Sequence, residues 1–265
     1  MISKNRIKFI RSLSLKKNRD ALGLFVAEGP KIVSDLLSNI TPVYIAATND
    51  WLKQNINILG VLKQEFHNDF HNDFAFDEVS DDELKRISFL ETPQNVLCVF
   101  RQPHDCKNIY DSVIDNICLA LDGVQNPGNL GTIVRVADWF GIHDVFCNSS
   151  CADVYNSKTV QATMGALSRV RVHYVNLEDE LSNLPVDCKI YGTFLDGDNI
   201  YKQELSRNGV IVMGNEGRGI SEAISKLVTN RVLIPNYPAE SATSESLNVA
   251  IATSIVCAEF RRRLL

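Results

Sequence analysis

Short apolar segments, separated by stretches with helical periodicity, dominate the second half of this 265-residue chain. Strands that are apolar almost throughout are typical of a mostly parallel sheet covered by helices on both faces. The sequence therefore predicts an α/β domain over residues 116–265, with ligands at the carboxyl ends of its strands. The expected strands are residues 117–121, 144–147, 170–174, 190–195, 210–213 and 232–234.

The first hundred residues also alternate between short strands and short helices, which predicts a smaller α/β unit. Pro30 suits the first turn of one helix, and Ser80 with Glu83 forms a capping box for another. Residues 101–116 are mixed and charged and contain Pro103, a composition that favours a linker. We therefore expect an amino-terminal domain over residues 1–105, with a linker to about residue 115. Its expected strands are residues 25–28, 43–47 and 96–100.

The composition excludes several kinds of protein. A formal net charge of −5 argues against a protein that coats nucleic acid indiscriminately, and no apolar run approaches the length that crosses a bilayer. The amino terminus is basic but lacks the apolar core of a secretory signal, and seven scattered cysteines favour a reducing compartment. We expect a cytoplasmic protein without a membrane partner.

Two pairs of residues have a spacing compatible with zinc. Cys147 and Cys151 are four positions apart, as are His67 and His71 within the tandem HNDFHNDF. Neither pair has the further ligands that a zinc site requires. The sequence therefore predicts no metal, with buried thiols at the first pair and an exposed polar duplication at the second.

The first nineteen residues carry seven basic side chains and no acidic one. Ile7, Ile10 and Leu13 define an apolar face, so the charges lie on the remaining arc of a helix. A solvated surface and an RNA-contacting surface both explain this pattern. The candidate RNA-binding residues are Lys4, Arg6, Lys8, Arg11, Lys16, Lys17 and Arg19.

The segment at residues 126–135, NPGNLGTIVR, follows a buried strand and changes from a tight turn into a helix. Ile133, Ala137 and Phe140 would face the core, which leaves Arg135 on the opposite side. Arg135 would then lie near the mouth formed by Asn126, Gly128 and Asn129. The alternative interpretation is an ordinary turn followed by a solvated arginine.

Two further segments repeat the order of strand, loop and helix. In GNEGRGIS, residues 214–221, the glycines allow the backbone to approach a ligand closely and Glu216 can accept hydrogen bonds. This loop lacks the Gly-Lys-Ser/Thr ending of a phosphate-binding loop, although a nucleotide-dependent enzyme remains an alternative. Ser246 and Asn248 precede an apolar helix that begins near Val249, where both could be simple N-cap residues.

Together and in this order, the three segments resemble the motifs of the SpoU/TrmH family of RNA 2′-O-ribose methyltransferases, part of the SPOUT superfamily. The match covers residues 126–135, residues 214–221, and Ile234-Pro235 with Ser246-Leu-Asn-Val249. The amino-terminal FVAEGPKIV and ETPQNVLCVF are similar to that family's ribosomal-protein-like substrate-binding domain. The segment between Pro235 and Ser246 is longer than the usual family spacing.

The resemblance implies methylation of a ribose 2′-hydroxyl in RNA, with S-adenosylmethionine as cofactor and without a metal. It also implies a trefoil knot in the carboxyl-terminal domain and a homodimer. The catalytic group would be Arg135, Asn126, Glu216, Ser246 and Asn248. The cofactor contacts would come from Gly214, Gly217, Ile234, Leu247 and Thr193, which precedes Gly197.

Several alternatives remain open at this point. The separate amino-terminal domain favours ribosomal RNA, but the motifs do not exclude tRNA as substrate. A non-catalytic RNA-binding protein of the same fold is a second alternative. Arg135 would either remove the proton or hold an RNA phosphate, and the second task is easier for a guanidinium, which strongly resists deprotonation.

Overall fold

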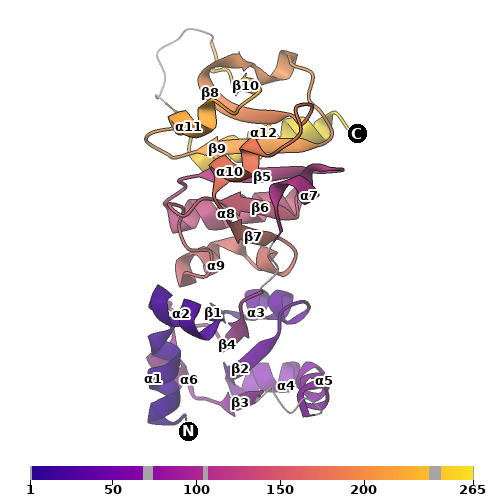
Figure 1. The fold of residues 1–265 in the computed structure, drawn as a ribbon. Helices are drawn as coiled ribbons and strands as arrows, with labels where there is room; N and C mark the ends of the chain where they lie inside the picture. Colours follow the sequence, from indigo (N-terminus) through magenta and orange to yellow (C-terminus); the bar gives the residue numbers. More distant parts are fainter. Residues whose placement is uncertain (1, 68–73, 104–106, 239–245, 265) are drawn as a thin grey trace. The chain divides into compact units, whose positions relative to one another are not determined.

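The computed structural model describes residues 2–67, 74–103, 107–238 and 246–264. The chain forms two compact units (Figure 1). Unit 1 consists of Met1–His104 together with Tyr155–Ser168, and unit 2 of Asp105–Val154 together with Arg169–Leu265. The segment Tyr155–Ser168, which the sequence assigned to the carboxyl-terminal domain, therefore lies in unit 1.

Unit 1 is built on a four-stranded sheet with the order β1-β4-β2-β3. Strand β4 runs antiparallel to β1 and β2, and β2 runs parallel to β3. The three strands predicted here are confirmed within one residue at each end. The strands are β1 (Leu24–Glu28), β2 (Pro42–Ala47), β3 (Ala75–Glu78) and β4 (Val96–Arg101).

The helices of unit 1 begin where the sequence indicates. Pro30 occupies the first turn of α3, and the capping box between Ser80 and Glu83 is present at α6. Helix α9 packs against β1, with the rings of Tyr155 and Phe25 4.8 Å apart. The helices are α1 (Lys4–Ser12), α2 (Lys16–Leu22), α3 (Pro30–Leu37), α4 (Asn49–Gln54), α5 (Ile56–His67), α6 (Asp81–Ile87) and α9 (Ser157–Thr163), with a 3-10 turn η1 (Ala166–Ser168).

Unit 2 contains the predicted parallel sheet. Six strands lie in the order β10-β8-β9-β5-β6-β7, and every neighbouring pair is parallel. The sheet's central strands are buried throughout, as their apolar sequences predict. The strands are β5 (Ile117–Asp122), β6 (Asp144–Cys147), β7 (Arg171–Tyr174), β8 (Ile190–Asn199), β9 (Gly209–Gly214) and β10 (Asn230–Leu233).

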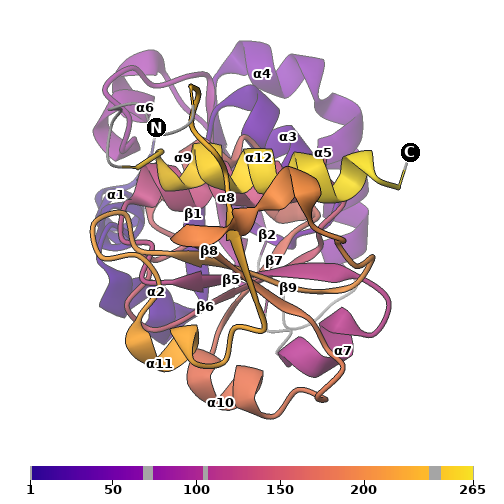
Figure 2. The same cartoon turned by 90° about the horizontal axis from the view of Figure 1, so that it is seen from above.

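Helices cover both faces of this sheet (Figure 2). Helices α8 and α12 lie side by side on one face, and α7, α10 and α11 cover the other. Helix α8 begins at Pro127, and its Ile133 and Ala137 are buried as predicted, whereas Phe140 is a half-buried C-cap residue. The helices are α7 (Ile109–Val113), α8 (Pro127–Trp139), α10 (Leu177–Ser182), α11 (Glu222–Ser225) and α12 (Val249–Arg262), with a 3-10 turn η2 (Ile200–Lys202).

The pairing of β8 with β10 is interrupted. Gly192 pairs with Arg231, but the next residue of β10, Val232, pairs with Asp198. Residues 193–197 therefore bulge out of the ladder at the carboxyl end of β8. None of the described helices is both long and apolar enough to cross a membrane.

Candidate active site

The first two motif loops lie next to each other because the strands before them are neighbours. Strand β5 pairs with β9 along its whole length, and the last pair in the register is Asp122 with Gly214. Since both strands are parallel, the loops that follow leave the same edge of the sheet. This edge is where ligands of parallel α/β sheets usually bind.

Asn126 caps helix α8. Its side-chain oxygen accepts hydrogen bonds from the amides of Gly128 at 2.8 Å and Asn129 at 3.2 Å, and Pro127 occupies the first turn. These bonds satisfy two amides that would otherwise lack partners at the start of the helix. The oxygen of this predicted catalytic residue is therefore used by the cap, in agreement with the alternative interpretation of the turn.

Asn215 holds the loop after β9 in place. Its side-chain oxygen accepts from the amides of Gly217 and Arg218, each at 3.0 Å, and its side-chain amide donates to the carbonyl of Gly123 at 2.7 Å. A Cβ atom at Gly214 would lie 2.3 Å from the backbone of Gly219, so only glycine fits there. The Gly217 amide, predicted to contact the cofactor, is satisfied within the loop.

Asn129 joins the three motifs. Its side-chain amide donates to Glu216 Oε1 at 2.9 Å, and its side-chain oxygen accepts from Asn248 Nδ2 at 3.0 Å. Asn248 also caps α12 through its own oxygen, which accepts from Ala250 and Ile251. Glu216 and Asn248 are thus brought together as predicted, but through a residue that was not among the predicted catalytic group.

The sequence contained a signal for this role of Asn129. In Asn126-Pro-Gly-Asn129, the first asparagine has the position of an N-cap, which leaves the second free to bond elsewhere. Ser246, another predicted catalytic residue, is exposed just before α12, and its side chain does not enter these bonds within the described part of the chain. Residues 239–245, most of the long loop before it, lie outside the described residues.

Arg135 lies apart from the Asn129 bonds. It is exposed on α8, six residues beyond Asn129, which corresponds to about 9 Å along the helix and roughly 120° around it. It shares a face with Trp139, four positions later, whose side chain is 84% exposed. Within one chain, Arg135 therefore lies on another side of α8 from Asn129, the residue that bonds to Glu216 and Asn248.

The predicted cofactor residues gather at the carboxyl ends of three adjacent strands, β10, β8 and β9. Thr193 begins the bulge of β8, Ile234 follows β10, and Gly214 ends β9. A Cβ atom at Gly197 would lie 2.7 Å from the Val232 backbone, so the bulge packs closely on β10. Leu247 is 47% exposed beside the start of α12.

Helices α8 and α12 run parallel, because both of their ends are joined. The bond between Asn129 and Asn248 links the amino ends, and Arg261 donates to the carbonyl of Phe140 at 2.7 Å near the carboxyl ends. Helix α12 is not covered on every side, because Ile251 is 54% exposed. In a single chain, α12 packs against α8, the sheet and the 3-10 turn η2.

The basic residues of unit 1 divide into two groups. Arg19 is 3% exposed and donates to the carbonyls of Leu13 and Ser14, so its predicted contact with RNA is wrong. Arg6 lies over the ring of Tyr44, and Arg11 donates to the carbonyl of Ser88. Among the seven amino-terminal basic residues, the exposed ones are Arg11 and the four lysines, Lys4, Lys8, Lys16 and Lys17.

Of the two pairs considered for zinc, only the cysteine pair has side chains that the structure describes. Cys147 and Cys151 are buried free thiols, and the hydrogen bond with Cys151, together with burial, raises the pKa of Cys147. No cluster of three or more His, Cys, Asp or Glu side chains suited to a metal occurs within the described ranges. His71 lies outside them.

Unit 2 is thus a parallel α/β domain whose polar site is formed by three loops at the carboxyl edge of the sheet. Residues 116–258 match the SpoU rRNA methylase family, and residues 4–98 match the MRM3-like substrate binding domain. The chain belongs to the SpoU rRNA methylase family.

Similar proteins extend over the whole chain. A TrmH-family structure from Porphyromonas gingivalis is 39% identical, with a TM-score of 0.84 and coverage of 99% of each chain. The AdoMet-bound rRNA methyltransferase from Sinorhizobium meliloti is 28% identical, with a TM-score of 0.85 and coverage of 100% of this chain and 98% of that one. The 23S rRNA (guanosine(2553)-2′-O)-methyltransferase of Bacillus subtilis is 28% identical over 97% of this chain and 96% of its own length.

Proposed function

We propose that this protein transfers a methyl group from S-adenosylmethionine to a ribose 2′-hydroxyl of ribosomal RNA. The observation that carries the proposal is the pair of hydrogen bonds at Asn129, which unites the three motif segments in one site. Two full-length relatives named as rRNA methyltransferases support it, one of them crystallised with AdoMet. Because these relatives are named as enzymes that act on rRNA, ribosomal RNA is favoured over tRNA as the substrate. We also propose a cytoplasmic location, on the basis of the seven scattered cysteines.

The chemistry of the residues at the ends of β8, β9 and β10 fits S-adenosylmethionine. Gly214 packs closely on the backbone of the loop that follows β9, and Ile234 and Leu247 offer apolar surface for an adenine ring. Residues 193–197 add backbone groups from the bulge. When bound, the cofactor supplies a methyl group on a positively charged sulfur. We also propose that the segment leading to α12 threads through this region as a trefoil knot, as the family resemblance implies.

The protein has two tasks in this reaction: to orient the ribose and to assist loss of the hydroxyl proton. The oxygen of the 2′-hydroxyl forms the new bond to the methyl carbon, the carbon–sulfur bond breaks, and the proton leaves to a base. Glu216 and Asn248, fixed by Asn129, present acceptor and donor groups to the ribose. Arg135 holds an RNA phosphate and stabilises the developing negative charge.

We further propose a homodimer in which Arg135 serves the partner's site. Arg135 lies on another side of α8 from Asn129, and its face of the helix carries the exposed Trp139. Neighbouring α12 exposes Ile251. Exposed apolar surface on paired helices favours a protein–protein interface, and a second copy seated on it would lie against Arg135.

Mass spectrometry of RNA tests the substrate. Ribosomal RNA and tRNA from a strain that lacks this gene should be compared with the parent strain, and the missing 2′-O-methyl group should map to ribosomal RNA. Purified protein should then transfer tritium-labelled methyl to that unmethylated RNA. A methyl group missing only from tRNA would overturn the choice of substrate, and failure to bind S-adenosylmethionine would favour a non-catalytic RNA-binding protein.

A further inference from the structure

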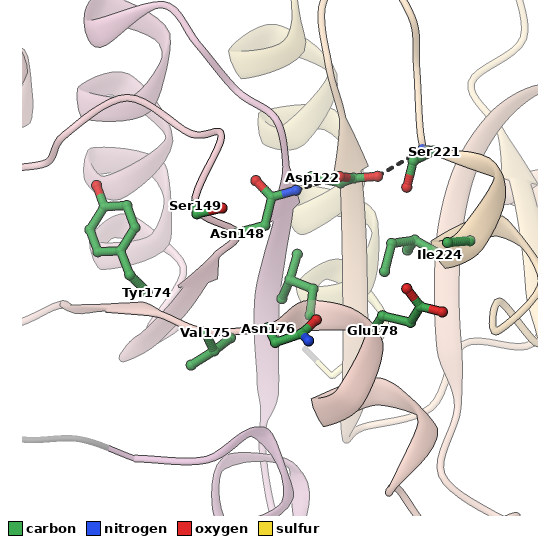
Figure 3. Close-up of a pocket in the computed structure, with 11 residues that line it drawn as sticks. Asp122, Asn148, Ser149, Tyr174, Val175, Asn176, Glu178, Ser221 and Ile224 are labelled. Carbon is green, nitrogen blue, oxygen red and sulfur yellow. Dashed lines mark hydrogen bonds between the residues drawn. The ribbon is translucent and has the colours of Figure 1, made fainter.

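A second polar cavity lies beside the motif loops in unit 2 (Figure 3). It has a volume of about 560 Å³, within the size range of small-molecule sites. It opens at the carboxyl ends of β5, β6 and β7, between the starts of α10 and α11. None of the residues assigned above to methyl transfer or cofactor binding lines it, so it needs an explanation of its own.

Hydrogen bonds at Asp122 tie one wall of the cavity to two of the motif loops. Asp122 is 6% exposed, and its two carboxylate oxygens accept from Asn148 Nδ2 and from the Ser221 amide, each at 2.7 Å. The oxygen of Asn148 accepts from the Gly123 amide at 3.1 Å. Asp122 begins the loop to Asn129 and Ser221 ends the loop that carries Glu216. The cavity therefore shares its wall with both loops.

The rim of the cavity carries polar side chains that can form hydrogen bonds with a ligand. Among the described residues, none hydrogen-bonds to the side chains of Ser149, Glu178 or Ser221, all of which line the cavity. Figure 3 shows the Glu178 carboxylate extending from the start of α10 toward Ile224 of α11. Asn176 donates to Asp179, which leaves its oxygen as a further acceptor.

The charge and apolar surface of the lining restrict the ligand. No lysine or arginine lines the cavity, so it does not suit a phosphate. The apolar residues of the lining are the half-buried Val175 and the buried Leu177 and Ile224. An acceptor-only carboxylate beside such a surface suits an uncharged aromatic ring with N–H groups at its edge.

We propose that this cavity binds a guanine base of the RNA substrate, with its N1–H and N2–H groups donated to the two oxygens of Glu178. Guanine is the RNA base that places two such donors side by side, and unstacked RNA bases are commonly recognised through this edge. The proposal rests on the proposed function, since it concerns the same RNA. Glu178 is a specificity residue, which anchors the strand next to the catalytic loops without touching the reacting atoms.

Nucleoside titrations of the full chain test the cavity directly. Guanosine should shift the amide resonances of residues around Ser149, Asn176 and Ser221 in ¹⁵N-labelled protein. Inosine, which lacks the 2-amino group, and uridine should bind about ten-fold more weakly, the effect of one lost charge-assisted hydrogen bond. E178Q should weaken guanosine about ten-fold. E222Q is the matched control, because Glu222 is an exposed carboxylate on α11 outside the lining, and should leave guanosine binding unchanged.

Equal affinity of the wild-type protein and E178Q for guanosine, or shifts confined to residues outside the cavity, would overturn the proposal. So would the absence of binding at the solubility limit of guanosine. Methyl transfer to unmethylated ribosomal RNA gives an independent measure: E178Q should raise KM about ten-fold and leave kcat within about two-fold. An unchanged KM in an active enzyme refutes the cavity alone. Absence of transfer by the wild type refutes the proposed function, and the nucleoside titrations still decide the cavity.

Discussion

Asn248 donates its side-chain amide to the oxygen of Asn129 over 3.0 Å, although 119 residues separate them in the chain. The same Asn129 donates to Glu216, so one side chain fixes two others from different motifs. Hydrogen bonds at a half-exposed position add little to stability, but they set the orientation of the groups they join.

Asn129→Ala should therefore lower kcat/KM by about a hundred-fold and the free energy of unfolding by no more than about 1 kcal/mol. Methyl-transfer kinetics and chemical denaturation measure the two effects separately. Thr132→Ala, one turn further along the exposed side of α8, is the control and should keep full activity. Loss of activity caused by unfolding alone would contradict this role of Asn129.

Arg135→Ala should abolish transfer while the affinity for S-adenosylmethionine, measured by calorimetry, stays within about two-fold. Mixed dimers of Arg135→Ala and Asn129→Ala chains, purified with two different tags, test whether the arginine acts across the interface. If it does, one of the two sites contains both native residues and the mixture regains about half of the activity. If Arg135 acts in its own chain, every site is defective and the mixed dimer stays inactive.

Asp144 begins β6, at the amino end of the sheet, and should make the free energy of unfolding depend on pH in the acidic range. Burial opposes ionisation there, but hydrogen bonds from His173, Lys107 and Ser112 outweigh it and lower the pKa of Asp144 below its usual value of 3.8. A carboxylate with a lowered pKa in the folded state stabilises the protein above pH 4, and this contribution is lost as the pH falls further.

Asp144→Asn should therefore reduce the free energy of unfolding by about 2 kcal/mol at pH 7 and less below pH 4. Thermal denaturation of both proteins from pH 7 to pH 3 checks the difference. The isosteric change at the exposed Asp115 is the control. Parallel curves for the wild type and Asp144→Asn would show that the ion cluster has no such role.

The lysines of unit 1 give a prediction about RNA affinity. Replacement of Lys4, Lys8, Lys16 and Lys17 by glutamine should weaken binding and reduce the slope of log K against log salt by about 0.7 for each lost phosphate contact. Filter binding at several salt concentrations measures the slope. Arg19→Ala should instead destabilise unit 1, because that side chain is buried. An unchanged slope in the lysine variant would favour the simple solvated surface.

The periodicity of the sequence predicted most of the fold, because apolar strands and helix caps are local signals. Strand β6 was predicted at its observed bounds, and the capping box at Ser80 is present. The β8 bulge could not be predicted, since it depends on the register with β10, about forty residues away. The inclusion of α9 in unit 1 likewise depends on a tertiary contact.

The sequence indicated several residues of the candidate site but not the hydrogen bonds that join them. Glu216 and Asn248 were identified by their motifs, whereas Asn129 was placed at the mouth of the site but not in the catalytic group. Arg19 looked like its basic neighbours, since a charge pattern does not show which side chain turns inward to satisfy carbonyl groups. In both cases the difference lies in side-chain direction, which spacing along the sequence does not specify.

The distance in sequence between Asn129 and Asn248 also bears on how the protein becomes active during synthesis. A nascent chain that has reached only β10 can already pair β5 with β9, yet it lacks the residue that completes the site. Contacts between such distant segments form slowly, because a long loop must close first. The site is therefore completed only when α12 has been synthesised and has packed on the finished sheet.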